Sequence, residues 1–239
     1  MSSVSSSRRP SRASLVALLA LASLLLGGEA RAAAGTASVP AAGHIAWAQV
    51  AVRSQPTTAA ARTTVLTQFH RDFRPRVVLA VGVRRDANGR PAWYRISLPG
   101  RPNGRTGWVP AGSLHVKPVS KEIVIDRSAR TLELRDGGRT VVRTRVAVGA
   151  PGMETPLGRF YVVARFRPTA PILGAYAFET SAYSKLSEWP GGGVVGVHGT
   201  NTPSLLGQAV SHGCVRVANA VILRLSRLVP VGTPIRIVA

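Results

Sequence analysis

The chain has little cysteine, and this limits the roles that its thiol chemistry can play. It has 239 residues and a single cysteine, Cys214, so no disulfide can form within the chain. A lone cysteine is most often a small buried apolar residue. The alternative is a reactive thiol, and the sequence around Cys214 has to decide between the two.

Acidic side chains are also scarce. Only 10 Asp and Glu oppose 31 Lys and Arg, which gives a formal net charge of +21. Residues 1–32 hold four Arg and one Glu, so the remainder has 27 basic and 9 acidic residues, or +18. Such a charge favours a polyanionic partner, for which nucleic acid is the first candidate. The alternative explanation is an Arg-rich bias in overall composition.

The N-terminal apolar run is too short for an ordinary membrane span. It covers Ala13–Leu26, whereas a membrane-spanning helix needs about 20 residues. Basic residues precede the run, and Ala30-Arg31-Ala32 follows it. This order is typical of a signal peptide over residues 1–32 with cleavage after Ala32, although a retained anchor is the alternative. Export predicts an extracytoplasmic protein, secreted or cell-wall associated, and argues against nucleic acid as the partner.

The next segments predict a leader and a small β domain. Residues 33–43 are rich in Ala, Gly, Ser and Thr, which indicates a flexible leader. Residues 44–118 show short apolar runs separated by turn signals such as Asn88-Gly89 and Asn103-Gly104, which predicts a small all-β barrel. The segments 94–99 and 102–110 resemble bacterial SH3-like domains that accompany wall enzymes.

Residues 119–239 predict a second, mostly β domain. Strands are expected at 123–125, 131–134, 141–148, 160–164, 194–197 and 235–237. Leu225 and neighbouring apolar residues have helical spacing over 220–228, and Asn219 is expected to be the N-cap. The Pro- and Gly-rich stretch 167–193 contains tyrosines and is interpreted as a long loop covering a substrate groove.

Two of the five histidines lie near Cys214. They are His198, at the end of a predicted buried strand, and His212, in Ser211-His212-Gly213-Cys214. A thiol becomes a strong nucleophile when an imidazole takes its proton, and acyl transfer also needs donors for the oxyanion. Backbone N–H groups near Gly213 and Cys214 are expected to supply those donors. The segment therefore predicts a reactive thiol.

Two other interpretations fit less well. A zinc site from His198, His212 and Cys214 would have one thiolate and no acidic ligand between residues 194 and 216. In papain-type endopeptidases the cysteine precedes its histidine, but no histidine follows Cys214. The order found here favours an acyltransferase whose base comes first in the chain.

That order is the basis of a family resemblance. His198-Gly199-Thr200 and the segment Ser211–Arg216 closely resemble the signature of the L,D-transpeptidase (YkuD) family. The resemblance also includes Gly149, Thr155–Phe160 and Val231–Pro234, and it covers about residues 123–239. It implies the family's mostly β, sandwich-like catalytic domain, with a helix after the cysteine.

The resemblance implies specific catalytic roles. Cys214 matches the nucleophile and His198 the base, while the carbonyl of Gly199 would hold the imidazole tautomer. Ser211, His212 and Gly213 match residues that shape the site and steady the intermediate.

The resemblance also implies residues that contact the substrate. Arg216 matches an arginine that binds a substrate carboxylate, although a structural ion pair is the alternative. A tyrosine from the loop completes the oxyanion hole in relatives, and Tyr176 and Tyr183 are both candidates. Thr200 is included among the expected substrate-binding residues.

The implied reaction is a peptidoglycan cross-linking step. Cys214 would attack the third residue of a stem peptide, release the terminal D-alanine and keep the acyl group as a thioester. The side-chain amine of a second stem would then form a 3→3 cross-link, with no cofactor and no metal.

The expected partners are stem peptides, anionic wall polymers and, as covalent inhibitors, carbapenems. The alternatives are an L,D-carboxypeptidase, with water as acceptor, and a non-catalytic wall-binding protein. The 44–118 domain is expected to hold the enzyme on the wall and to be unnecessary for the chemistry.

Overall fold

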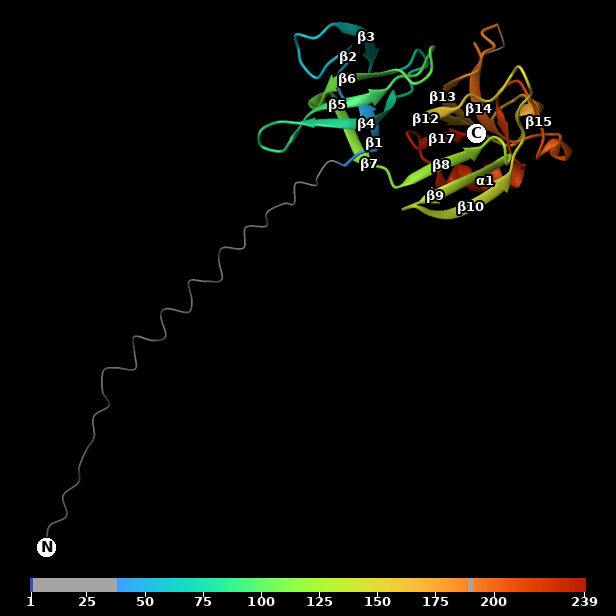
Figure 1. Ribbon diagram of the computed structural model, residues 1–239. Helices are drawn as coiled ribbons and strands as arrows, with labels where there is room; N and C mark the ends of the chain where they lie inside the picture. The colour runs from blue at the N-terminus through green and yellow to red at the C-terminus, as the bar shows by residue number, and fades with distance from the viewer. Residues whose placement is uncertain (2–37, 189–190) are drawn as a thin grey trace. The chain divides into compact units, whose positions relative to one another are not determined.

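The structure is a computed structural model that describes Met1 and residues 38–188 and 191–239. The chain from Ala37 onward forms one compact unit built around two large sheets (Figure 1). The predicted signal peptide and residues 33–37 of the predicted leader lie outside the described residues, so for these the expectations stay predictions. In the described part of the chain, no helix has the length and apolar character needed to cross a membrane.

The first sheet is antiparallel and has seven strands in the order β3-β2-β6-β5-β4-β1-β7. The strands are β1 (Ala41–Ile45), β2 (Gln49–Arg53), β3 (Arg62–Thr67), β4 (Val77–Arg85), β5 (Pro91–Ser97), β6 (Thr106–Pro110) and β7 (Leu114–Pro118). It encloses its own apolar core, which includes Ile45, Val52, Ile96 and Val109. The sheet lies where the sequence predicts a small β domain, and its SH3-like character remains a prediction.

The expected leader over 33–43 extends too far. Strand β1 starts at Ala41, whose side chain is 2% exposed, and it pairs with both β4 and β7. Gly43 lies so close to the backbone at His115 that no side chain would fit there. Alanine and glycine are weak strand signals in a sequence, but here their small size permits the close packing.

The second sheet is mixed and has eight strands in the order β10-β9-β8-β17-β12-β13-β14-β16. They are β8 (Lys121–Asp126), β9 (Thr131–Asp136), β10 (Arg139–Arg145), β12 (Gly158–Phe166), β13 (Ala177–Tyr183), β14 (Val194–His198), β16 (Val215–Arg216) and β17 (Pro234–Val238). The pairs β8–β17 and β14–β16 are parallel. The separate strands β11 (Val148–Gly149) and β15 (Ala209–Ser211) also pair in parallel.

One helix, α1 (Asn219–Leu228), follows β16 and packs Ile222 and Leu225 into the core of the second sheet. Short 3-10 turns occupy Ala111–Ser113, Pro171–Leu173 and Pro203–Leu205. The expectation of a mostly β fold with a helix after the cysteine is confirmed by this arrangement.

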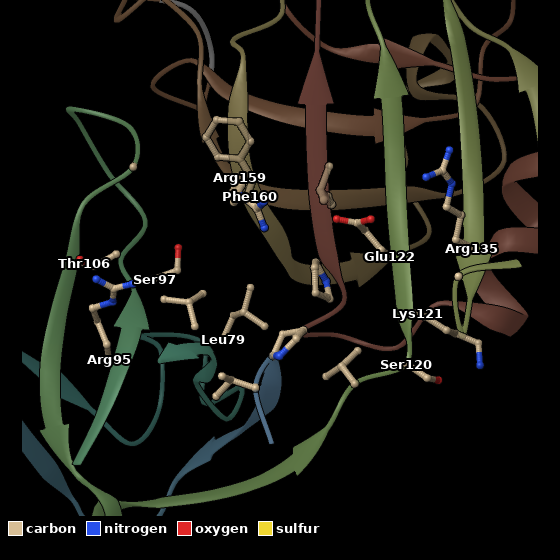
Figure 2. Close-up of a pocket in the computed structure, with 18 residues that line it drawn as sticks. Leu79, Arg95, Ser97, Thr106, Ser120, Lys121, Glu122, Arg135, Arg159 and Phe160 are labelled. Carbon is tan, nitrogen blue, oxygen red and sulfur yellow. The ribbon is translucent and has the colours of Figure 1, made fainter. Parts of the chain in front are cut away.

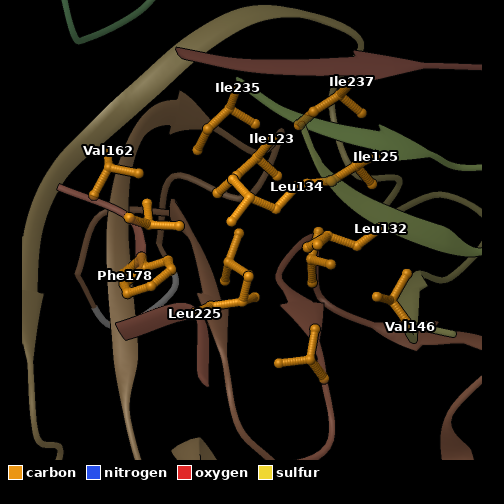
Figure 3. Close-up of a cluster of buried hydrophobic side chains, with 14 of the residues drawn as sticks. Ile123, Ile125, Leu132, Leu134, Val146, Val162, Phe178, Leu225, Ile235 and Ile237 are labelled. Atoms are coloured by element: carbon orange, nitrogen blue, oxygen red, sulfur yellow. The ribbon is translucent and has the colours of Figure 1, made fainter. Parts of the chain in front are cut away.

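Alternation of side chains explains the central strands. In β9, Leu132 and Leu134 are fully buried, while Glu133 and Arg135 between and beyond them face outward. Figure 3 shows the inner face, where Leu132 and Leu134 meet residues of β8 and β17 and pack toward Phe178 and Leu225.

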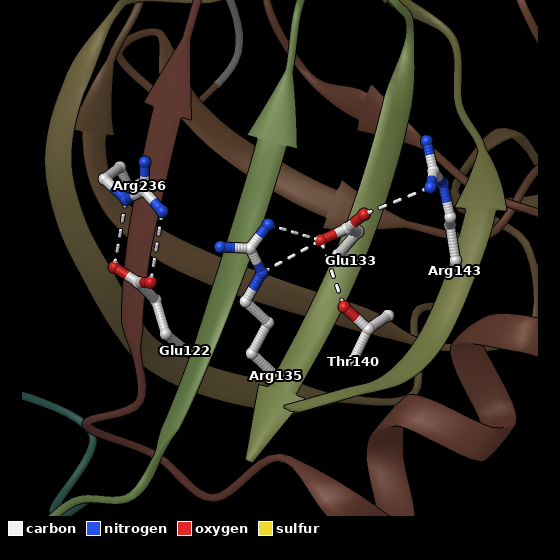
Figure 4. Close-up of polar contacts among 6 residues, drawn as sticks. All are labelled: Glu122, Glu133, Arg135, Thr140, Arg143 and Arg236. Carbon is white, nitrogen blue, oxygen red and sulfur yellow. Dashed lines mark hydrogen bonds and ion pairs between the residues drawn. The ribbon is translucent and has the colours of Figure 1, made fainter. Parts of the chain in front are cut away.

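The outer face of these strands carries ion pairs. Glu133 binds Arg135 at 2.6 Å and Arg143 at 3.6 Å, and Glu122 of β8 binds Arg236 of β17 at 3.3 Å (Figure 4). Because these charges are partly or largely exposed, solvent screens each pair and it contributes little to stability. The stability of this sheet therefore comes mainly from the buried apolar side chains on its inner face.

The predicted long loop over 167–193 is wrong in its middle. Residues Ala177–Tyr183 form β13, which pairs with β12 and β14 inside the second sheet. Five of its seven residues are buried on both faces of the sheet. The alternating pattern that marks a half-exposed strand is therefore missing, and the strand is hidden between two Pro- and Gly-rich turns.

Candidate active site

Cys214 lies in the short connection between β15 and β16, against the edge of β14. Residues Val197 and His198 of β14 pair with Val215 and Arg216 of β16 in parallel register. This register places Cys214 beside Gly196, whose backbone N–H donates to the cysteine Sγ at 3.3 Å. Two short parallel segments therefore fix the position of the thiol.

The thiol is held in its protonated form. Burial raises the pKa of Cys214, and the Gly196 N–H and the positive charge of Arg216 act against that rise. Since only a thiolate is strongly nucleophilic, this cysteine needs a base to take its proton when it reacts near neutral pH.

His198, the last residue of β14, has the protonation state that such a base needs. Burial lowers its pKa, and nearby backbone carbonyls oppose the shift only in part. Its Nδ1 lies 2.6 Å from the carbonyl oxygen of Gly199. A carbonyl only accepts hydrogen bonds, so Nδ1 carries the hydrogen, and the other ring nitrogen, Nε2, is left to accept a proton.

The imidazole and the thiol border the same small surface above Gly196. A Cβ placed on Gly196 would lie 3.7 Å from His198 Cδ2 and 3.8 Å from Cys214 Sγ. The imidazole ring and the thiol are therefore neighbours on this surface. No hydrogen bond joins the two groups among the described residues, and such contacts often tighten only when substrate is bound.

Ser211 fixes the turn that presents the cysteine. Its hydroxyl donates to the Cys214 carbonyl at 2.6 Å and accepts from the Gly213 N–H at 3.1 Å. Gly213 has φ +116°, and a Cβ there would lie 2.8 Å from the Cβ of Ser184. Glycine is therefore required at 213 by both its backbone conformation and its packing.

This turn corrects one expectation about the oxyanion donors. The Gly213 N–H is already bound to Ser211, so it is not available to an intermediate in this conformation. The Cys214 N–H makes no hydrogen bond within the described residues and is the donor that remains.

Arg216 brings a positive charge to the site without an acidic partner. Its charge lowers the pKa of both His198 and Cys214, and no ion pair involves it in the described part of the chain. Its Nε is buried and has no hydrogen-bond partner. The alternative of a structural ion pair is therefore not found among the described residues.

Asn219 has a role that the sequence analysis missed. The expected N-cap is wrong, because the cap position is Ala218 and Asn219 makes no capping hydrogen bond. Its Oδ1 accepts from the N–H groups of Ala175 at 3.0 Å and Thr200 at 3.2 Å, and its Nδ2 donates to the Thr200 carbonyl at 3.0 Å. It therefore ties Ala175 to Thr200, the residue that follows Gly199, whose carbonyl accepts from His198.

Thr200 is placed differently from the expected substrate-binding role. It is 3% exposed, and its hydroxyl accepts from the Thr202 N–H at 3.0 Å. Its side chain thus stabilises the turn after His198, which is why it has no surface for substrate.

The two candidate tyrosines flank different parts of the site. The Tyr176 carbonyl accepts from Gly199 N–H, and its ring packs edge-on against Phe178. Tyr183 ends β13 and precedes Ser184, which contacts the Gly213 turn. Neither hydroxyl makes a hydrogen bond within the described residues, so both remain candidates for the oxyanion hole.

His212 lies in the turn between β15 and Cys214 and is partly buried. Across the described residues, no group of three or more His, Cys, Asp or Glu could hold a metal ion.

A separate cavity of about 720 Å³ lies between the first and second sheets (Figure 2). Its lining includes Arg95 and Leu79 from the first sheet and Glu122, Arg159 and Phe160 from the second. Neither Cys214 nor His198 lines it, so it is distinct from the thiol site.

Comparison with known proteins gives a consistent family. Residues 120–237 match the YkuD family, described as the L,D-transpeptidase catalytic domain. The chain is 32% identical to the YkuD protein of Bacillus subtilis over 149 residues, which are 62% of this chain and 77% of the relative.

Two solved structures are similar at low identity. A crystal structure of an Enterococcus faecium L,D-transpeptidase variant has 21% identity and a TM-score of 0.41, covering 52% of this chain and 56% of that one. The L,D-transpeptidase LdtMt1 in complex with imipenem has 16% identity and a TM-score of 0.45, covering 84% of this chain and all of that one.

The fold and the site thus define a cysteine-containing β domain with an imidazole beside its thiol. This chain belongs to the L,D-transpeptidase (YkuD) family.

Proposed function

We propose that this protein is a peptidoglycan L,D-transpeptidase that uses Cys214 as its nucleophile. The observation that carries the proposal is that the Cys214 thiol and the His198 imidazole both lie against Gly196. In support, the Gly199 carbonyl accepts from His198 Nδ1, which leaves Nε2 as the nitrogen that can take a proton, and the ring and Cys214 Sγ both lie against Gly196. A wall-binding protein without catalysis has no need of such a pair.

The reaction starts with transfer of the Cys214 proton to His198. The thiolate attacks the carbonyl carbon of the third stem residue, and the Cys214 N–H stabilises the oxyanion that forms. Tyr176 or Tyr183 adds a second donor. The bond to the terminal D-alanine breaks, D-alanine leaves with the proton held on His198, and a thioester remains on Cys214.

The second half returns the enzyme to its starting state. The side-chain amine of another stem attacks the thioester carbonyl, and His198 accepts a proton from that amine. The C–S bond breaks and the thiolate is reprotonated, leaving a 3→3 amide cross-link. Water in place of the amine makes the enzyme an L,D-carboxypeptidase, the second candidate, which uses the same residues.

Arg216 is the proposed partner of a carboxylate on the donor stem. Its buried Nε lacks a hydrogen bond, and a guanidinium suits planar recognition of a carboxylate. The expected location outside the cytoplasm, which rests on the predicted signal peptide, is part of the same proposal.

Anionic wall polymers are the proposed partner of the basic surface. Arg95 and Arg159 line the cavity between the sheets, and within the described residues neither has an acidic partner. The net charge of +21 supports the same kind of partner.

Intact-mass measurement after incubation with a carbapenem tests the enzyme assignment. LdtMt1 was solved in complex with imipenem, which makes imipenem a suitable probe. We expect one covalent adduct, located at Cys214 by peptide mapping. A folded protein that gains no mass, or gains it at another residue, would contradict the assignment.

A further inference from the structure

A loop of the first sheet makes side-chain contacts with a segment next to the active site. This loop, residues 98–105 between β5 and β6, meets the segment formed by the described residues 183–188 and 191–193, called here the 183–193 segment. The contacting residues are about 80 to 90 positions apart in sequence.

Arg101 provides most of these contacts. Its Nη1 donates to the carbonyl of Gly192 at 2.8 Å, and its Nη2 donates to those of Ser184 at 2.9 Å and Leu186 at 3.3 Å. None of these carbonyls accepts another hydrogen bond in the described part of the chain. The guanidinium carbon also lies 5.0 Å from the centre of the Tyr183 ring.

Asn103 binds the backbone at the end of β13. Its Nδ2 donates to the Tyr183 carbonyl at 2.7 Å, and its Oδ1 accepts from the Tyr183 N–H at 3.0 Å. The amide side chain thus makes the two hydrogen bonds that a neighbouring strand would make to this residue. Arg101 and Asn103 together hold both ends of the 183–193 segment.

The same segment contacts the turn that presents the thiol. Ser184 donates its N–H to the Gly193 carbonyl at 2.8 Å, and its Cβ lies 2.8 Å from the point where a Gly213 Cβ would be. A cavity of about 800 Å³ next to this segment is lined by Arg101 and Asn103 together with Glu154, Tyr183 and Ser184. A shift of the segment would therefore move one wall of this cavity and the surface against Gly213.

We propose that Arg101 and Asn103 are positioning residues for acyl transfer, acting through the 183–193 segment on the turn of Cys214. The first sheet thus takes part in the chemistry, against the expectation that residues 44–118 are unnecessary for it. Only the kinetic test of this role depends on the proposed function. The effect of Arg101 and Asn103 on the 183–193 segment can be measured without enzyme activity.

The test compares Arg101→Ala and Asn103→Ala with Arg105→Ala as a matched control. Arg105 belongs to the same loop and is exposed, and among the described residues its side chain donates only to the Pro99 carbonyl, at 3.5 Å within that loop. Each full-length variant is measured for its rate of acylation by imipenem and for its rate of alkylation by iodoacetamide. Thermal unfolding midpoints are recorded alongside.

We expect Arg101→Ala and Asn103→Ala to slow acylation about 10- to 100-fold, since a displacement of about 1 Å at a site costs that much. Alkylation should be unchanged, because a small reagent needs only the thiol and its base. Arg105→Ala should stay within about twofold of the unmodified protein in both assays. Arg101→Lys should recover only part of the rate, because an ammonium lacks the planar fork that reaches several carbonyls.

Amide hydrogen exchange gives the second readout. Arg101→Ala should speed exchange at Ser184 and Leu186, whereas Arg105→Ala should not. Hydrogen exchange tests the positioning role even if the unmodified protein forms no imipenem adduct. Such a missing adduct would contradict the proposed function but not the positioning role. Unchanged acylation and unchanged hydrogen exchange in both variants would overturn the proposal. Equal losses of acylation and alkylation with a lowered unfolding midpoint would also overturn it, because they indicate general unfolding.

Discussion

The two sheets differ in what they bury. The first sheet and its connections bury two polar side chains, Ser97 and Ser113, among the described residues. The second sheet and its loops bury eight: Thr155, Thr180, Ser181, Ser184, His198, Thr200, Ser211 and Thr233. Burying a polar group is costly unless it is hydrogen-bonded, so the second sheet has to supply more internal hydrogen-bond partners than the first.

Most of the polar groups near the thiol are satisfied by backbone atoms. Thr155 accepts from the Gly149 N–H at 2.9 Å, Thr180 donates to Val195 at 2.6 Å, and Ser211 closes the cysteine turn. These bonds link β11, β13, β14 and the turn before β16. The second sheet thus holds these residues from within, whereas we propose that the first sheet acts on the site through the loop that holds Arg101 and Asn103.

Among changes in the second sheet, Cys214→Ser should have the largest effect on acylation. We expect no detectable acylation by imipenem, because a hydroxyl is much harder to deprotonate than a thiol at neutral pH. The unfolding midpoint should hardly change, since the two side chains are similar in size. Acyl transfer retained by the folded variant would remove the thiol from the mechanism.

His198→Ala should produce the next largest effect. Loss of a general base should slow acylation about 10²- to 10⁴-fold. His212→Ala is the matched comparison, because His212 lies in the same turn as the thiol. The true base is the histidine whose loss shifts alkylation of Cys214 to higher pH, so a shift in His212→Ala with none in His198→Ala would reverse the roles.

The unmodified protein should show the pH dependence of this pair. Burial lowers the His198 pKa from 6.5, so the imidazole stays neutral at and somewhat below that pH, and acylation should fall only under more acidic conditions. Burial raises the Cys214 pKa from 9.0, so direct alkylation should keep rising as the pH passes that value. A rate of acylation that falls already between pH 8 and pH 7 would contradict a neutral His198.

Asn219 offers a smaller and more selective test within the second sheet. Asn219→Asp keeps the oxygen that accepts from Ala175 and Thr200 but loses the donor to the Thr200 carbonyl, whereas Asn219→Ala loses all three bonds. We expect acylation to fall more in Asn219→Ala than in Asn219→Asp, with a loss of stability of about 1–3 kcal/mol for the alanine variant. Equal acylation in both variants and the unmodified protein would show that the Gly199 segment needs no such support.

The smallest expected effect is on wall binding. Retention on purified sacculi should weaken steeply with added salt, because exposed charges are screened within about 10 Å at 0.1 M. The double variant Arg95→Ala/Arg159→Ala should be retained less than Arg84→Ala, which removes an exposed charge outside the cavity. Its acylation rate should be unchanged. Retention that is insensitive to both salt and these changes would exclude charge as the source of wall affinity.

The sequence predicts the parts of the fold that have a local signal. The alternation around Leu132 and Leu134 identifies β9, and the spacing of apolar residues around Leu225 identifies α1. The segments around His198 and Cys214 carry the family signature. These features depend on neighbours in sequence, so one chain is enough to find them.

The missing parts depend on contacts between distant segments. β13 is buried on both faces and lacks alternation, so it resembles a loop between two glycine-rich turns. Asn219 and Arg101 bind backbone carbonyls and amides tens of residues away, and such contacts leave no periodic pattern. An asparagine before a helix is usually a cap, and an arginine in a polar loop is usually solvated, so the sequence favours the wrong interpretation in both cases.

Mass analysis of muropeptides tests the central claim most directly. The purified protein is incubated with a disaccharide-tetrapeptide, and Cys214→Ser serves as the matched control. We predict a dimer that has lost one D-alanine and contains a 3→3 cross-link, with no dimer from the control. A folded protein that yields only the tripeptide would be an L,D-carboxypeptidase, and one that leaves the tetrapeptide intact would contradict the assignment of Cys214 and His198 as an acyl-transfer site.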